Sequence, residues 1–318
     1  MRAALPHRTG PMRPGTATGS GASPKVASLR LCDVSEEAAM AVTAERELQD
    51  FWSRQTDEFL DSDPSGMAVV CWTGMPTWLN ALYDHSQRIG FSRLIRDVPM
   101  NGKLILDVGT GVGRWVEFLL NRGAGTVIGI DIEPKRLSRA SRRQYSGDAS
   151  FGVASAARLP FPDCSFDFVS SIAVLLHLDY ESKEKAIAEI ARVTKPGGHV
   201  AILELTHMKT ERPYVFPMRR DEWVSSFGRN GLRLVKIVGN EYFPLLRSAT
   251  AAHRLVFRSS SREKRDNVRI GRSQGLAQKP LLVALRTLTW LSYPVEWFCG
   301  VVVPPRMAMT NGFLFVRD

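Results

Sequence analysis

Cysteine is scarce in this sequence, and its few cysteines lie far apart. The 318 residues contain Cys32, Cys71, Cys164 and Cys299, with no CxxC or CxxH spacing. Such scattered thiols argue against a disulfide framework and against a structural zinc site. We therefore expect a protein of a reducing, cytoplasmic compartment that binds no metal.

The first 28 residues lack an apolar stretch of the length that a secretory signal needs. They are rich in Gly, Pro, Ser, Thr and Ala and show no apolar periodicity, so residues 1–28 are predicted to be a disordered leader. Their Lys and Arg residues, without any acid, also fit a mitochondrial transit peptide. A flexible tail or an upstream start codon is the commoner reason for such a leader.

Most of the chain has no excess of positive charge, although the formal net charge is +10. The leader carries Arg2, Arg8, Arg13 and Lys25, and residues 254–279 carry eight Lys or Arg against two acids. These two segments account for the whole excess. A general basic face for nucleic acid is therefore not expected.

The pattern of apolar residues predicts an α/β fold with a helical cap in front of it. A helix is expected from Ser35 to about Leu60 and another after Pro76, within a cap over residues 29–100. From Lys103 short apolar runs alternate with helical segments, which is typical of a doubly wound, mostly parallel sheet. The runs are KLILDV (103–108), TVIGID (126–131), SFGV (150–153), FDFVSS (166–171), HVAILEL (199–205), GLRLVKIV (231–238) and GFLFVRD (312–318).

These runs suggest the following division of the chain. The predicted core covers residues 101–243, an insertion follows over 244–305, and residues 306–318 supply the last core strand. One helix is expected after the first strand, with Val112 and Val116 on its buried side, and another starts with Glu133 as cap and Pro134 at the first helical position. A third is expected from about Glu181 to just before KPGG.

Three glycines follow the first strand in LILDVGTGVGRW, at positions 109, 111 and 113. A strand, a glycine loop and a helix N-terminus together offer bare backbone amides to a ligand. The dinucleotide fingerprint GxGxxG would need its third glycine at Arg114, so the match to that motif is incomplete. Asp107 can accept from an ammonium group or order the loop, and Asp131, at the end of the second strand, can accept from ribose hydroxyls.

Two further stretches complete an ordered set of motifs: ARLPFPDCSFDFVSS (157–171) and RVTKPGGHVAILEL (192–205). With them, the region from Leu104 to Leu205 resembles the class I S-adenosylmethionine-dependent methyltransferases, in particular the group that includes the ubiquinone and menaquinone biosynthesis C-methyltransferases. The resemblance implies S-adenosylmethionine as cofactor. It also implies a seven-stranded sheet in which the last strand lies antiparallel between strands five and six.

The resemblance further implies roles for individual residues. Asp107 and the glycine loop would hold the methionine part, Asp131 the ribose, and Ile132 would pack on adenine. Relatives have an Asp for the adenine amino group where Ser155 stands here, so adenine anchoring is expected to rest more on the amide of Ala156. The implied cofactor-binding residues are Asp107, Gly109, Gly111, Gly113, Asp131, Ile132, Ser155, Ala156 and Ile172.

Methyl transfer from a sulfonium needs alignment and a dry pocket, and a hydroxyl or carbon acceptor must also lose a proton. A histidine is the usual proton acceptor near neutral pH. His177, beyond the fourth strand, and His207, beyond the fifth, are the catalytic candidates, and His85 is a third. The sequence alone does not show which of the three histidines accepts the proton.

The acceptor is expected to be a small molecule, a sugar or a lipid-linked compound, methylated on oxygen or carbon. Nucleic-acid base methyltransferases resemble one another in an Asn/Asp-Pro-Pro-aromatic motif after strand four, where this chain has Ser170 to Ala173. No RNA-binding module is recognisable either, so nucleic acid is not expected as a partner. The alternatives are a nicotinamide-dependent oxidoreductase and a cofactor-binding scaffold without turnover; the oligomeric state stays open.

The insertion ends in a long apolar stretch, residues 281–305. Arg286, Pro294 and Glu296 interrupt it, so a membrane-spanning helix is not expected. One interpretation is a helical cap over the substrate pocket with a solvated basic loop. The other is an interfacial lid over residues 254–303, whose aromatic side chains touch lipid while the basic run meets anionic headgroups. The lid would give a cytoplasmic protein peripheral membrane contact; its aromatic residues are Trp290, Tyr293 and Trp297.

Overall fold

The computed structural model describes residues 36–60, 65–71, 77–207, 214–242 and 293–318, together with Val283, Ala284, Thr287 and Leu291. The predicted leader and the basic run 254–279 lie outside the described residues. Across the part of the chain that the structure describes, no helix combines the length and apolar character needed to cross a lipid bilayer.

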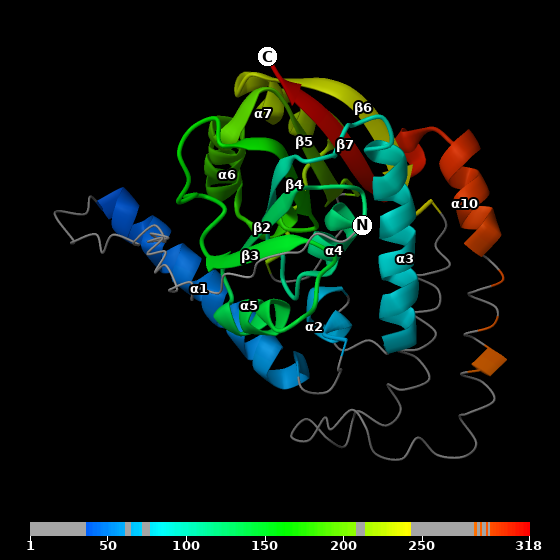
Figure 1. Ribbon diagram of the computed structural model, residues 1–318, viewed down its shortest axis with the longest axis horizontal. Coiled ribbons are helices and arrows are strands. Elements are labelled where there is room, and N and C mark those ends of the chain that lie inside the picture. The colour runs from blue at the N-terminus through cyan, green and yellow to red at the C-terminus, as the bar shows by residue number, and fades with distance from the viewer. Residues whose placement is uncertain are drawn as a thin grey trace, which may run out of the picture.

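A seven-stranded sheet forms the centre of the molecule (Figure 1). Its strand order is β3-β2-β1-β4-β5-β7-β6, and β7 runs antiparallel to both β5 and β6. The predicted α/β class and the predicted place of the last strand are confirmed. The strands are β1 Leu104–Val108, β2 Thr126–Asp131, β3 Asp148–Val153, β4 Phe166–Ile172, β5 Thr194–Leu205, β6 Leu232–Asn240 and β7 Thr310–Arg317.

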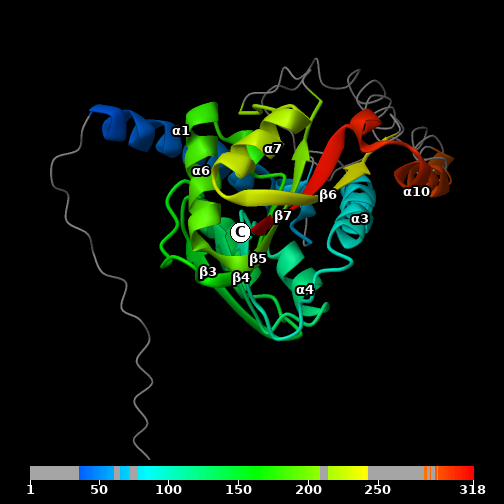
Figure 2. The same ribbon diagram turned by 90° about the horizontal axis from the view of Figure 1, so that it is seen from above.

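Helices cover both faces of this sheet (Figure 2). One buried apolar cluster joins α6 and α7 to one face, and a second joins α3 and α4 to the other. Helix α10 lies beside α3, away from the centre of the sheet (Figures 1 and 2). The helices are α1 Glu36–Phe59, α2 Met67–Val70, α3 Thr77–Leu94, α4 Arg114–Leu120, α5 Pro134–Ser141, α6 Tyr180–Val193, α7 Arg220–Arg229 and α10 Tyr293–Val302, with short 3-10 turns η2 Leu175–His177 and η4 Pro305–Met307.

Local capping explains where two of the helices begin. Glu133 accepts from the Lys135 amide at 3.0 Å with Pro134 at the first helical position, which confirms the predicted start of α5. Asp179 accepts from the Ser182 amide at 2.8 Å and so starts α6 one residue before the predicted Glu181.

Two predicted boundaries were wrong. Helix α4 begins only at Arg114, because Gly113 has φ 75°, so Val112 belongs to the glycine loop and packs in the apolar cluster of Phe59 and Val69. Strand β5 starts at Thr194 and includes KPGG, whereas the sequence suggested a strand from His199. The register with β4 shifts between Phe166 and Phe168, which accommodates the extra residues.

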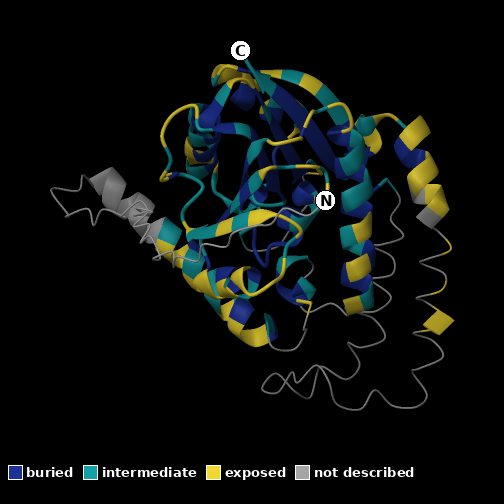
Figure 3. Cartoon of the chain, viewed as in Figure 1, coloured by how far each residue is buried: buried dark blue, intermediate teal, exposed yellow. Residues whose placement is uncertain are grey.

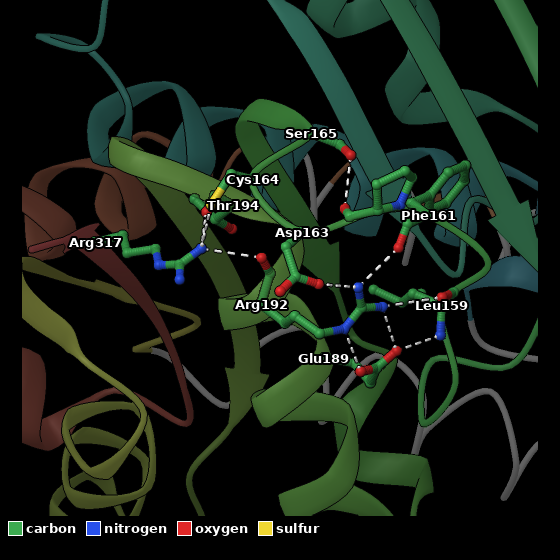
Figure 4. Close-up of polar contacts among 10 residues, drawn as sticks. Leu159, Phe161, Asp163, Cys164, Ser165, Glu189, Arg192, Thr194 and Arg317 are labelled. Carbon is green, nitrogen blue, oxygen red and sulfur yellow. Dashed lines mark hydrogen bonds and ion pairs between the residues drawn. The ribbon is translucent and has the colours of Figure 1, made fainter.

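The amino ends of β4 and β5 are fastened by Arg192, at the end of α6 (Figure 4). Its guanidinium binds Glu189 at 2.7 Å and Asp163 at 2.7 Å, and donates to the carbonyls of Leu159 and Phe161. These contacts join the two stretches 157–171 and 192–205 whose motifs pointed to the fold. The Arg192 contacts therefore stabilise the fold at the amino ends of the strands, opposite the carboxyl ends of β1, β2 and β4.

Candidate functional site

The glycine loop between β1 and α4 lies at the carboxyl ends of the parallel strands. Gly109 and Gly111 have φ 70° and 58°, which side-chain-bearing residues rarely adopt. A Cβ on Gly109 would overlap the Val174 side chain, and one on Gly111 would come within 2.7 Å of Val70. The loop is thus held close to both the β4–α6 connection and α2.

Asp131 fixes the shape of this loop. Its Oδ2 accepts from the Gly111 amide at 2.8 Å and its Oδ1 accepts from the Glu133 amide at 2.9 Å. Burial raises the pKa of the Asp131 carboxyl, while Arg136 and the two amides oppose that rise. Each carboxylate oxygen has a second lone pair, so the group can still accept from a further hydroxyl donor.

Asp107, at the end of β1, has spare hydrogen-bonding capacity in a buried place. Its Oδ1 accepts from the Ser170 hydroxyl at 2.8 Å, but its buried Oδ2 has no hydrogen-bond partner among the residues that the structure describes. Burial raises the pKa of Asp107 to about 6, against the opposing effects of the Thr110 hydroxyl, the Ser170 hydroxyl and the Arg114 charge. A buried acceptor without a donor is costly, so this oxygen suits a ligand that brings a donor, above all a cationic one.

Arg114 occupies the position where the dinucleotide fingerprint has its third glycine, and sequence reasoning did not assign it a role. Its guanidinium is buried and donates to Asp84 at 2.6 Å and to Gln87 at 2.7 Å. Asp84 also binds Arg88 at 2.6 Å. Because Asp84 and Gln87 belong to α3, Arg114 ties the helical cap to the start of the glycine-loop helix.

The other implied cofactor residues lie along the same edge of the sheet. Ser155 follows β3, whose last residue pairs with Asp131, and its hydroxyl accepts from the Ala157 amide at 3.2 Å. Ala156 is the residue between them. The carbonyl of Ile132 accepts from Gln49 of α1 at 3.1 Å. Ile172, at the end of β4, is instead packed in the apolar cluster on the α3 and α4 face.

Helix α1 lies against the carboxyl edge of the sheet, which the sequence did not predict. Thr56 accepts from Arg136 at 2.9 Å, and Ser53 donates to Glu133, so the helix is fastened to α5. Trp52 contacts the Arg136 guanidinium at 4.7 Å on one side and the His177 ring at 4.7 Å between centroids on the other. The Trp52 ring thus bridges the α5 side of the site and the turn that follows β4.

The candidate histidines lie in different surroundings. His177 is half-buried in η2, and its Nδ1 lies 2.7 Å from the Tyr214 carbonyl. A carbonyl oxygen only accepts, so Nδ1 carries the proton and Nε2 is the acceptor in the neutral ring. His207 is exposed after β5, where its backbone amide donates to the Met309 carbonyl at 3.2 Å. His85 is exposed on α3.

Glu204, near the end of β5, is a buried residue that the sequence analysis missed. Its carboxylate accepts from the amides of Val174, Leu175 and Leu176 at 3.2, 3.0 and 3.1 Å. Burial raises the pKa of Glu204 to about 7, while those amides and Lys183 oppose the rise. Glu204 therefore holds the turn that carries His177.

No group of three His, Cys, Asp or Glu among the described residues could hold a metal ion.

The sequence of this site matches a known domain. Residues 106–202 match the family described as a methyltransferase domain. The O-methyltransferase resE of Aspergillus sclerotiorum is 31% identical over 137 residues, which are 40% of this chain and 51% of that protein. The 27-O-demethylrifamycin SV methyltransferase of Amycolatopsis mediterranei is 35% identical over 115 residues, 35% of this chain and 42% of that protein.

A solved structure shares the fold over most of the chain. It is the magnesium protoporphyrin IX methyltransferase of Synechocystis with bound SAH, which is 14% identical, has a TM-score of 0.53, and covers 86% of this chain and all of its own. The chain spans about half the length of the curated relatives named above.

Residues 106–202 thus match a methyltransferase domain, and the sheet that contains them has the Rossmann-like methyltransferase fold. This assignment replaces the nicotinamide-dependent alternative. The narrower resemblance to the ubiquinone and menaquinone group stays a prediction.

Proposed function

We propose that this chain transfers a methyl group from S-adenosylmethionine to an oxygen of a small-molecule acceptor. The buried Asp107 Oδ2, which has no hydrogen-bond partner within the described part of the chain and lies beside the glycine loop, carries this proposal. The names of the two curated relatives, an O-methyltransferase and a 27-O-demethylrifamycin SV methyltransferase, favour oxygen over carbon as the acceptor atom.

The residues of the site fit the cofactor part by part. Asp107 Oδ2 would accept from the methionine ammonium group, which supplies the missing cationic donor. Asp131 would accept from ribose hydroxyls with the lone pairs that the Gly111 and Glu133 amides leave over. Ile132 would contact adenine, with the turn at Ser155 and Ala156 close to the same strand end.

S-adenosylmethionine supplies an electrophilic methyl group when bound, so the chain's residues mainly exclude water and orient the acceptor. Trp52 of α1 and the turn held by Glu204 would close the site. His177 would accept the acceptor's hydroxyl proton at Nε2, because Nδ1 is engaged by the Tyr214 carbonyl. His207, exposed and without such an orienting contact at its ring in the described contacts, is the second candidate.

Transfer of an isotope-labelled methyl group tests the proposal. The full chain would be incubated with labelled S-adenosylmethionine and small-molecule extract, and labelled products would be sought by mass spectrometry. A labelled ether or ester that Gly111→Val abolishes is expected, since a branched side chain at φ 58° would strain the loop and meet Val70. If the chain binds S-adenosylmethionine but yields no labelled product, the alternative of a cofactor-binding scaffold without turnover is favoured.

A further inference from the structure

Helix α10 presents an apolar side to solvent. Trp297, Phe298, Val301 and Val302 are 52, 57, 59 and 55% exposed. Their spacing places them on one side of the helix. Figure 3 shows this exposed side turned away from the body of the molecule.

The opposite side of α10 is fixed against the fold. Cys299 is buried, and a Cβ on Gly300 would overlap the guanidinium of Arg93 in α3. Gly300 also lines a small cavity with Ser86 and Asn240, between α3 and β6, and Trp297 reaches the same cavity from the margin of the exposed side. The helix therefore cannot turn its apolar side inward without losing these contacts.

Another exposed apolar side chain follows α10 in the sequence. Met307 in η4 is 64% exposed, and the exposed Arg306 precedes it. Contiguous exposed apolar surface is unusual on a soluble fold and marks interaction sites.

Charge indicates which partner this surface fits. Between residues 267 and 317, Glu296 is the only acid, and residues 254–279 carry eight Lys or Arg against two acids. An exposed apolar helix next in sequence to a cationic segment is the combination that binds anionic lipid headgroups and the adjoining acyl chains. A second copy that docked through the same region would bring like charge to it.

We propose that α10, through Trp297, Phe298, Val301 and Val302, docks on the surface of an anionic lipid bilayer. The ten residues of α10 extend about 15 Å, half the thickness of a bilayer's hydrocarbon core, so the helix lies along the interface. The cations of residues 254–279 add attraction to the headgroups, which salt screens. Docking requires neither cofactor nor acceptor and is independent of the proposed function.

Flotation of the full chain with vesicles tests this proposal. Binding to phosphatidylcholine vesicles that contain phosphatidylserine is expected to be at least about tenfold tighter than to phosphatidylcholine alone, and to weaken in high salt. Equal binding to both vesicles, or binding to neither, overturns the proposal.

Paired variants locate the surface. Val301→Glu is expected to weaken binding to the anionic vesicles about tenfold or more, because a carboxylate enters the apolar side and meets like charge. Val153→Glu is the control, since Val153 is 59% exposed at the end of β3, which lies at the opposite edge of the sheet from β6, the strand that α10 contacts. Thermal unfolding should show both variants equally folded. Equal vesicle binding by the two variants overturns the assignment to α10.

Two further measurements test the basic segment and self-association. Replacing Arg262, Lys264 and Arg265 by Gln together should weaken binding to anionic vesicles about tenfold or more while leaving thermal unfolding unchanged.

Sedimentation shows whether a second copy of the chain, instead of lipid, binds this surface. A dimer that Val301→Glu dissociates, in a chain that does not float, would overturn the proposal.

Discussion

At the scale of single residues, Glu204 is a buried carboxylate that the fold holds close to its own ionisation point. Its folded pKa of about 7 lies above the ordinary value of 4.5, because burial outweighs the three amides that it accepts from. A carboxyl whose pKa rises on folding stabilises the protein at low pH, below the unfolded value. That contribution is lost as pH rises from about 4.5 through about 7.

We therefore expect Glu204→Gln to flatten the pH dependence of stability. The wild-type free energy of unfolding should fall by about 2 to 3 kcal/mol more than that of the variant between pH 5 and pH 7.5. Urea unfolding at the two pH values measures this difference. The charge of Glu204 also raises the pKa of Lys183, so the comparison is repeated in a Lys183→Met background, which removes that coupling. Parallel curves for the two proteins would contradict the account of Glu204.

Substitution of His177 and of His207 by Ala distinguishes a catalytic histidine from a surface histidine. Because Nδ1 of His177 faces the Tyr214 carbonyl, its Nε2 is oriented as a base, and His177→Ala should lower turnover by roughly 10²- to 10⁴-fold. Cofactor affinity should stay within about threefold, since the base acts on the acceptor. His207→Ala is expected to retain turnover. Near wild-type rates for both variants would place the base elsewhere or show that the acceptor needs none.

The sequence could predict the positions of Asp107 and Asp131 near the ends of β1 and β2, but not the contacts of Glu204 or Arg114. A carboxylate after a strand and beside a glycine loop has a local cause, because strand ends and glycines share one edge of the sheet. Glu204 also ends a strand, yet its role depends on the path of the turn from Val174 to Leu176, which folds back from another strand. Arg114 finds its partners on α3, about thirty residues earlier.

At the scale of elements, Arg192 connects the end of α6 to the loop before β4. It contacts the Asp163 carboxylate and two carbonyls of that loop, and also Glu189 within α6 (Figure 4). We expect Arg192→Met to lower the free energy of unfolding by about 2 kcal/mol, because buried or half-buried carbonyls lose their donors.

A matched control is Arg219→Met. Arg219 makes an exposed ion pair with Asp221 at 3.3 Å, and such pairs contribute little, so a change below about 0.5 kcal/mol is expected. Urea unfolding of both variants provides the measurement. Equal losses would show that the Arg192 contacts do not hold the loop.

Elements were predictable where local signals determine them and not where distant contacts do. The cap of α5 and the positions of β1, β2 and β4 follow from local patterns. The placement of α1 across the carboxyl edge depends on contacts such as Thr56 with Arg136, eighty residues apart. No periodicity within α1 contains that information.

At the scale of the whole molecule, cofactor binding and folding should be coupled. A ligand that binds only the folded state stabilises it by about 2.7 kcal/mol at a hundred times its Kd. For a domain of this size, we expect S-adenosylhomocysteine to raise the Tm by several degrees. NADH at the same concentration should leave the Tm unchanged, and an equal rise with NADH would contradict a site specific for S-adenosyl compounds.

The whole sheet order was predictable only through the resemblance, because β7 follows β6 after about seventy residues and still inserts beside β5. Nothing local in residues 310–317 specifies that neighbour. An anionic lipid partner for residues 254–303 was one of two interpretations of the sequence, and the structure adds which side of α10 is exposed.

The most direct test of the central claim is calorimetric titration of S-adenosylhomocysteine into the full chain and its Asp107→Asn variant, without metal. Asp107→Asn removes the charge that would meet the ligand ammonium, at a cost of about 1.5 to 3 kcal/mol, so we expect affinity to fall about tenfold or more. Asp148→Asn, exposed at the start of β3, is the control and should bind as the wild type does. Wild-type protein that fails to bind, or equal affinity in Asp107→Asn, would contradict the proposed cofactor site.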